Sequence, residues 1–112
     1  MRNDFMEFIP NCEISQHALD RISKHFQVLR NRGIDTSVII NAIRRVCNNP
    51  EFYDREERES NKRYVCFNLP QGFYFIIVYI LVPPIVRIIT VILTNKYRDV
   101  LNKCGRSHNL TS

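Results

Sequence analysis

Residues 73–94 read FYFIIVYILVPPIVRIITVILT, and this stretch decides which kind of fold the chain can adopt. It contains eleven Ile or Val residues and a single charge, Arg87, so it is long and apolar enough to cross a bilayer. Pro83 and Pro84 stand at its centre, where they would break a helix, and β-branched side chains favour strands. We therefore expect no membrane span but two neighbouring strands, over residues 73–81 and 85–94.

Two helices are expected before these strands. Ser15 can cap a helix over residues 16–31, in which apolar side chains recur every three or four positions, and Gly33 punctuates its end. Asp35 or Thr36 can cap a second helix, which ends before Pro50. The expected core residues of the two helices are Ile14, Ala18, Leu19, Ile22, Phe26, Leu29, Ile39, Ala42, Ile43 and Val46.

The remaining segments complete an α+β domain. Residues 62–69 read as a strand, followed by a turn at 69–72, and residues 52–59 could add a polar edge strand. A short helix over 96–103 ends the domain, and 105–112 is expected to be a flexible tail. We thus predict one domain over 1–104, with two N-terminal helices packed on a three- to four-stranded antiparallel sheet and a short C-terminal helix.

Composition limits the function classes. A chain of 112 residues with 45% hydrophobic residues supports one core, and its net charge of +5 favours phosphate-bearing partners. The four cysteines include no C-x-x-C pair, so we expect no metal, and Cys47 and Cys66 are interpreted as core residues. The first ten residues lack the apolar run of a secretory signal. A cytoplasmic protein with free thiols is the expectation.

Strand parity gathers polar groups on one side of the sheet. Alternate residues share a face, so Tyr64 lies with Lys62, Cys66 and Asn68, opposite Arg63, Val65, Phe67 and Leu69. In the last strand the same rule places Arg87, Ile89, Val91 and Leu93 opposite Ile88, Thr90, Ile92 and Thr94. If the two polar faces coincide, Tyr64, Thr90 and Thr94 meet on one surface with Lys62 at its rim.

The first helix adds a titratable group near this surface. At 100° per residue, His17, Arg21 and Lys24 form a stripe that flanks the apolar one, at the boundary between helix and sheet. An imidazole beside two cations suits acid–base chemistry on a phosphate, although a solvated helix face is the simpler interpretation. Weaker candidates are His25, His108 and a general base at Glu56 or Glu57, while Arg44 and Arg45 read as a solvated face.

Four segments together carry a family resemblance: ISQHALDRI at 14–22, RNRGIDTSVIINAI at 30–43, KRYVCF at 62–67 and VRIITVIL at 86–93. They resemble the small RelE/ParE-like proteins of the barnase, colicin and RelE group, in particular members that open with a Ser-x-His-Ala-x-x-Arg helix followed by Arg-Gly-Ile. The resemblance implies a RelE-like fold and a toxin-like endoribonuclease that needs no metal or cofactor. It also implies a partner, an antitoxin or immunity protein, that covers the active face.

The resemblance further implies which residues act. The family's first-helix His and Arg correspond to His17 and Arg21, and its last-strand Thr corresponds to Thr90; Tyr64 fits its use of aromatic groups on the sheet. RNA contacts are expected from Lys24, Lys62, Arg63, Arg87, Thr94, Lys96 and Arg98. The reaction would be attack of a ribose 2′-hydroxyl on the adjacent phosphate. A non-catalytic nucleic-acid- or protein-binding module of the same fold is the alternative, and the sequence leaves a homodimer open.

Overall fold

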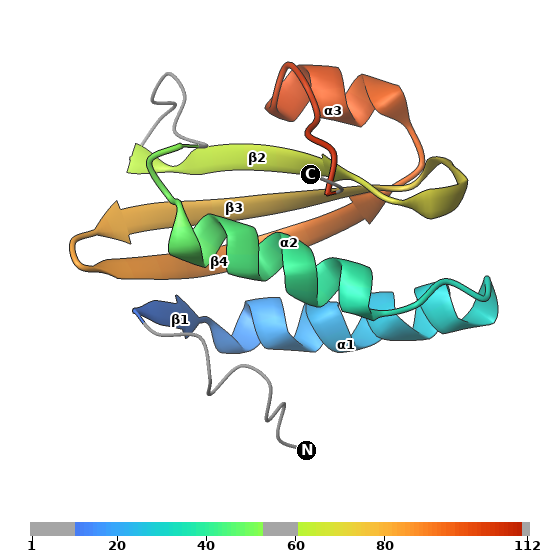
Figure 1. Cartoon of the computed structure of the whole chain (residues 1–112), viewed down its shortest axis with the longest axis horizontal. Helices are drawn as coiled ribbons and strands as arrows, with labels where there is room; N and C mark the ends of the chain where they lie inside the picture. The colour runs from blue at the N-terminus through green and yellow to red at the C-terminus, as the bar shows by residue number, and fades with distance from the viewer. Residues whose placement is uncertain (1–10, 53–60, 111–112) are drawn as a thin grey trace.

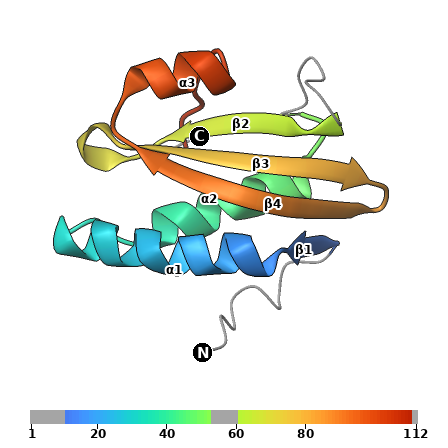
Figure 2. The same cartoon turned by 180° about the vertical axis from the view of Figure 1, so that it is seen from behind.

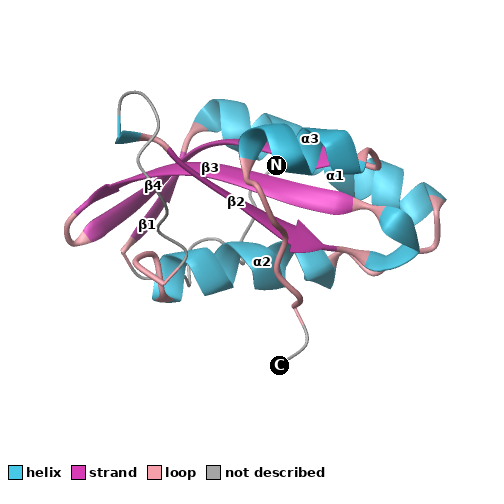
Figure 3. Cartoon of the chain, turned by 90° about the horizontal axis from the view of Figure 1, so that it is seen from above, coloured by secondary structure: helices cyan, strands magenta, loops and turns pink. Residues whose placement is uncertain are grey.

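The computed structural model describes residues 11–52 and 61–110, which form an α+β fold of one four-stranded sheet and three α-helices (Figure 1). The elements in chain order are β1 (Cys12–Ile14), α1 (Gln16–Asn31), α2 (Ser37–Asn48), β2 (Arg63–Asn68), the 3₁₀ turn η3 (Pro70–Gly72), β3 (Tyr74–Val82), β4 (Ile85–Thr94) and α3 (Tyr97–Lys103). Helix α2 lies on one face of the sheet and α3 on the other (Figure 3). The predicted α+β class and the predicted helices are confirmed.

The sheet is mixed, and this corrects the antiparallel sheet expected from the sequence. Its order is β1-β4-β3-β2, with β3 antiparallel to both neighbours and β1 parallel to β4, where Cys12 pairs with Val86 and Ile14 with Ile88. The fourth strand is thus β1, which is three residues long and is separated from α1 by Ser15 alone. The polar edge strand considered at 52–59 lies outside the described residues except for Phe52, which is in a turn.

The apolar run forms the β3–β4 hairpin as predicted. Strand β4 has the expected bounds, β3 is displaced by one residue, and Pro83 and Pro84 occupy the turn. Within the part of the chain that is described, every helix is too short or too polar to span a bilayer.

Helix α1 starts against the edge of β4. The Ser15 hydroxyl accepts a hydrogen bond from the Ala18 amide at 3.0 Å, which confirms the predicted cap, and it also donates to the Ile89 carbonyl at 2.7 Å. The Ser15 amide donates to the Ile88 carbonyl at 3.0 Å. One residue therefore caps α1 and continues the edge pairing where β1 ends.

The loop between the helices is fixed by Gly33 and Asp35. Gly33 has a φ of +70°, and the Ile34 amide donates to the Leu29 carbonyl at 2.9 Å. Helix α1 therefore ends at a residue in the left-handed conformation, which glycine adopts most easily. At the start of α2 it is the Asp35 carboxylate that accepts from the Ser37 amide, at 2.9 Å, and Thr36 makes no side-chain cap. This hydrogen bond lowers the pKa of Asp35. Of the two residues that could cap the second helix, Asp35 and Thr36, it is therefore Asp35 that does so.

The sheet carries a separate apolar cluster on each face. The larger cluster joins α1 and α2 to odd-numbered residues of β2 and β3, among them Val65, Phe75 and Ile77. The smaller cluster packs Val100 and Cys104, from α3 and its C-cap, on Cys66, Ile76 and Val78. The residues predicted for the core of α2 are confirmed, because Ile39, Ala42, Ile43 and Val46 are all fully buried.

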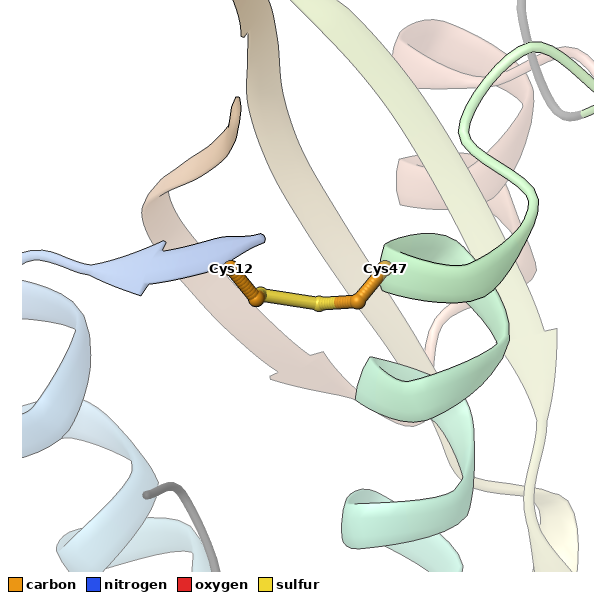
Figure 4. Close-up of a disulfide and its surroundings, with 2 residues drawn as sticks. All are labelled: Cys12 and Cys47. Carbon is orange, nitrogen blue, oxygen red and sulfur yellow. A yellow bond between two sulfur atoms is a disulfide. The ribbon is translucent and has the colours of Figure 1, made fainter. Parts of the chain in front are cut away.

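Cys12 and Cys47 form a disulfide that ties β1 to the end of α2 (Figure 4). The expectation of reduced thiols is wrong for this pair and confirmed for Cys66 and Cys104, which are buried and belong to no disulfide. Hydrogen bonding to Cys104 and burial raise the pKa of the Cys66 thiol, so Cys66 stays a neutral core group. The interpretation of Cys47 and Cys66 as core residues is also confirmed.

The C-terminal segment was expected to be loose after residue 104, but residues 107–110 run beside β2. The His108 amide donates to the Cys66 carbonyl and the Asn68 amide donates to the His108 carbonyl, both at 2.8 Å. The Asn68 side chain also donates to Asn109 at 2.7 Å. The backbone around His108 is thereby paired with the outer edge of β2, near the end of that strand.

Replacing Ser15 by Ala tests the start of α1. The change removes both the helix cap and the hydrogen bond to Ile89, so we expect the free energy of unfolding to fall by about 1–2 kcal/mol. Urea denaturation measures this loss. The exposed Ser23, whose hydroxyl bonds only within α1, provides the control as Ser23→Ala and should change stability by less than about 0.5 kcal/mol. Equal stability of the two variants would contradict the assigned role.

Reduction of the disulfide should also destabilise the protein. Cys12 and Cys47 are 35 residues apart, and closing a loop of this length stabilises a fold by about 3–4 kcal/mol. Urea denaturation with and without reductant should show a loss of this order for the natural protein and none for Cys12→Ser, which has no disulfide to reduce. An unchanged midpoint on reduction of the natural protein would be inconsistent with this linkage.

Candidate nucleic-acid interface

The sheet face opposite α2 is only partly covered. Helix α3 lies over the end where β4 finishes, and no helix within residues 11–52 and 61–110 covers the end with the β3–β4 turn (Figure 2). We call this part the open face; it carries Ile80, Arg87 and Thr90, and Tyr64 lies at its border, packed against the cluster under α3. These side chains are half-buried except for Arg87, which is exposed.

Tyr64 and Thr90 lie in one row across the sheet, at the border of the open face, with the buried Val78 between them. Tyr64 pairs with Val78 and Val78 pairs with Thr90, so the two polar side chains are separated by one strand, about 10 Å. Thr94 shares their side of the sheet, but its hydroxyl donates to the Asp99 carboxylate at 2.6 Å and accepts from the Lys96 amide. Thr94 thus fixes the start of α3 instead of standing beside Thr90.

A β-bulge in β4 corrects the predicted faces of that strand. Val78 pairs with Thr90 and Tyr79 pairs with Ile88, so Ile89 is an extra residue and the alternation shifts there. As a result Ile88 packs in the α1–α2 cluster with Val91, whereas Arg87 joins Thr90 on the open face. The grouping of Arg87 with Val91 was therefore wrong, and the bulge brings a cation to the candidate site.

Arg21 is fixed at the edge of β4 beside Thr90. Its Nε donates a hydrogen bond of 2.7 Å to the Val91 carbonyl, and the two Nη groups remain as further donors on the same guanidinium. His17 lies one turn earlier on the same side of α1 and is exposed, as is Lys24 one turn later. The predicted helix–sheet boundary is confirmed for Arg21, with His17 and Lys24 on its outer side.

The other expected RNA contacts are spread over the molecule. Lys62 precedes β2 next to the open face, whereas Arg63 pairs with Tyr79 and belongs to the side of α2. Lys96 and Arg98 are exposed at the start of α3, at the covered end of the sheet. Arg87 faces Glu13 across the β1–β4 pair at 3.9 Å, and both side chains are exposed, so this contact neutralises Arg87 only weakly.

His25 is a titratable group whose burial was not among the expectations from the sequence. It is 8% exposed, its Nδ1 has no hydrogen-bond partner, and its ring meets Phe75 edge to face at 5.9 Å. Burial, together with the nearby Arg21 guanidinium, lowers the pKa of His25 to about 4. The imidazole is therefore neutral near pH 7. Its place in the apolar repeat of α1 was the available signal.

The polar groups on and beside the open face are chemically suited to a phosphate chain. Arg21 and Arg87 supply guanidinium donors, Tyr64 offers a stacking surface, and Thr90 a hydroxyl. Among residues 11–52 and 61–110, no three His, Cys, Asp or Glu side chains gather closely enough to hold an ion. Glu56 and Glu57, considered as a general base, lie outside the described residues.

Comparison of the chain with family models, with curated proteins and with solved structures found no match.

The buried neutral His25 predicts a pH-dependent stability. Its pKa is about 4 in the folded protein and 6.5 when unfolded, so the unfolded chain binds more protons between these values. Stability is full above about pH 6.5 and falls as the pH drops toward 4. We expect a loss of about 1–2 kcal/mol between about pH 7.5 and pH 5, measured by urea denaturation.

His25→Leu should remove most of this difference, because leucine fills the site and does not titrate. His17→Gln is the matched control, since His17 is exposed and its loss should leave the pH dependence in place. A His25→Leu protein with the natural slope would show that another group is responsible.

Proposed function

We propose that the chain binds single-stranded RNA on the open face and cleaves it without a metal ion. The observation that carries this proposal is the hydrogen bond from Arg21 to the Val91 carbonyl. It holds a guanidinium at the edge of β4, at the residue that follows Thr90, and Thr90 shares a row of the sheet with Tyr64. A cation, a hydroxyl and an aromatic ring on one surface suit a phosphodiester with a base on each side.

The proposed reaction is internal transesterification. The ribose 2′-oxygen forms a bond to the adjacent phosphorus while the bond from phosphorus to the 5′-oxygen breaks. His17 takes the 2′ proton or donates a proton to the leaving 5′-oxygen, since an imidazole can do either near neutral pH. Arg21 stabilises the charge of the phosphorane, and Thr90 orients the phosphate. Tyr64 stacks a base or, when His17 takes the 2′ proton, donates a proton to the leaving 5′-oxygen; a proton that no side chain takes or supplies is exchanged with water.

A non-catalytic binding module is the second candidate. The Arg21–Val91 hydrogen bond also satisfies a strand-edge carbonyl, which is reason enough for Arg21 to be there. On this alternative the open face binds RNA or a protein partner, and Ile80, which is half-buried at its centre, gives it apolar contact area. Stoichiometric RNA binding without cleavage would support this candidate.

The proposed activity has consequences for partners and location. An RNA-cleaving toxin needs an inhibitor, and an antitoxin or immunity protein of acidic character would fit the basic, partly apolar open face. A homodimer formed through the same face is a further proposal. RNA substrates place the protein in the cytoplasm, whereas the Cys12–Cys47 disulfide is typical of oxidising compartments. Labelling of thiols at cell lysis would show whether Cys12 and Cys47 are bonded in the cell. Labelled Cys12 and Cys47 would indicate a reducing compartment such as the cytoplasm, and unlabelled ones an oxidising compartment.

Cleavage of a fluorescent single-stranded RNA by the purified protein in the presence of a chelator tests the function. We expect His17→Ala to lower the cleavage rate at least about 100-fold, because general acid–base catalysis contributes this much or more. Arg21→Gln should lower it to a similar extent, since glutamine can still donate to Val91 but carries no charge. Tyr64→Phe and Tyr64→Ala together separate proton donation from stacking.

Ser23→Ala and Arg30→Gln are the controls, because both residues are exposed on α1 away from the stripe of His17 and Arg21. Each variant is checked for folding by circular dichroism and denaturation. No cleavage by the natural protein, or undiminished cleavage by a folded double variant of His17 and Arg21, would overturn the proposed catalytic centre.

A further inference from the structure

A polar pocket of about 320 Å³ lies along α2, the helix on the other face of the sheet from the open face. Its lining residues are Asn41, Arg44, Arg45, Asn48, Asn49 and Leu110. The first four follow one another at helical spacing and so form one stripe on α2. The sequence predicts only a solvated helix face here, because the opposite wall comes from the far end of the chain.

That wall is held in place by backbone hydrogen bonds. Residues 107–110 run beside β2, where His108 pairs with Cys66 and Asn68, and this brings Leu110 to α2. The Arg45 guanidinium donates through Nη2 to the Leu110 carbonyl and is half-buried. Arg45 is therefore positioned by the fold, and the pocket has a defined shape on both sides.

The charge of the pocket is unbalanced. Helix α2 contains no Asp or Glu, and neither Arg44 nor Arg45 meets a carboxylate within residues 11–52 and 61–110. Two positive charges that line one pocket repel each other, and an anion bound between them relieves this repulsion. The other polar lining groups are three asparagine carboxamides, whose N–H groups can also donate to an anion.

These groups match the phosphate of a nucleotide. Guanidinium groups bind phosphate oxygens in pairs, and asparagine can hydrogen-bond two atoms on the edge of a nucleobase. The volume lies in the range of sites for small organic ligands. We propose that this pocket binds the phosphate of a nucleotide, with Arg44 and Arg45 on the phosphate and Asn41 and Asn48 near the base. The site is independent of the proposed cleavage.

Titration of the full ¹⁵N-labelled chain at low ionic strength tests the proposal, with the side-chain amide signals of Asn41, Asn48 and Asn49 as the readout. The probes are inorganic phosphate, adenosine 5′-monophosphate, the dinucleotide ApA and adenosine. We expect saturable shifts with the three phosphate-bearing probes and none with adenosine. Tighter binding of the monophosphate than of ApA identifies a free nucleotide as the ligand, and the reverse identifies a nucleotide within an RNA chain.

Arg44→Gln is the informative variant, because Arg44 is exposed and glutamine suits a helix, so the fold should persist. It should weaken binding at least about tenfold. Asn48→Asp, which keeps the size of the side chain and adds a negative charge, should do the same. The matched controls Arg30→Gln and Asn31→Asp on α1 should bind as the natural protein does. Absence of saturable shifts, equal binding of adenosine and its monophosphate, or undiminished binding by Arg44→Gln would overturn the proposal.

Discussion

The hydrogen bonding between α1 and the edge of β4 is the interaction on which the rest of the structure depends. Strand β1 pairs with β4 only as far as Ile88, and beyond it the edge carbonyls of Ile89 and Val91 would face solvent. Ser15 and Arg21 donate to these two carbonyls from α1. Unpaired edge groups invite pairing with another chain, so this cover protects the sheet and also fixes the helix. The same contact holds the candidate cation Arg21, so stability and proposed function share a residue.

Local patterns of the sequence predicted the elements well. Each element was predicted from a signal that spans only a few residues: the spacing of apolar residues in α1 and α2, the capping by Ser15, and the two prolines of the hairpin. The bulge at Ile89 had no such signal, because it lies in a run of β-branched residues that fit either face of a strand. That one extra residue reversed the predicted side of Arg87, which shows how strongly the candidate site depends on register.

Contacts between distant segments were the part that the sequence could not reveal. Strand β1 is too short to read as a strand, and its partner β4 lies more than seventy residues further on. The pairing of Cys12 with Cys47 and the return of residues 107–110 to β2 likewise depend on the tertiary fold. The α2 pocket follows from these contacts, since Leu110 reaches Arg45 only because His108 pairs with β2.

Arg21 stands between two histidines whose environments differ. His25, one turn later on α1, is buried, and its pKa of about 4 keeps it neutral near pH 7. The core therefore does not contain a second cation next to Arg21, which would be costly to bury. His17, one turn earlier, is exposed to solvent. Because His25 stays neutral, it adds no positive charge beside Arg21 from the protein interior. Under the proposed function the phosphate meets this guanidinium on the side of His17, so that a proton-transfer group and a phosphate-binding group act together there.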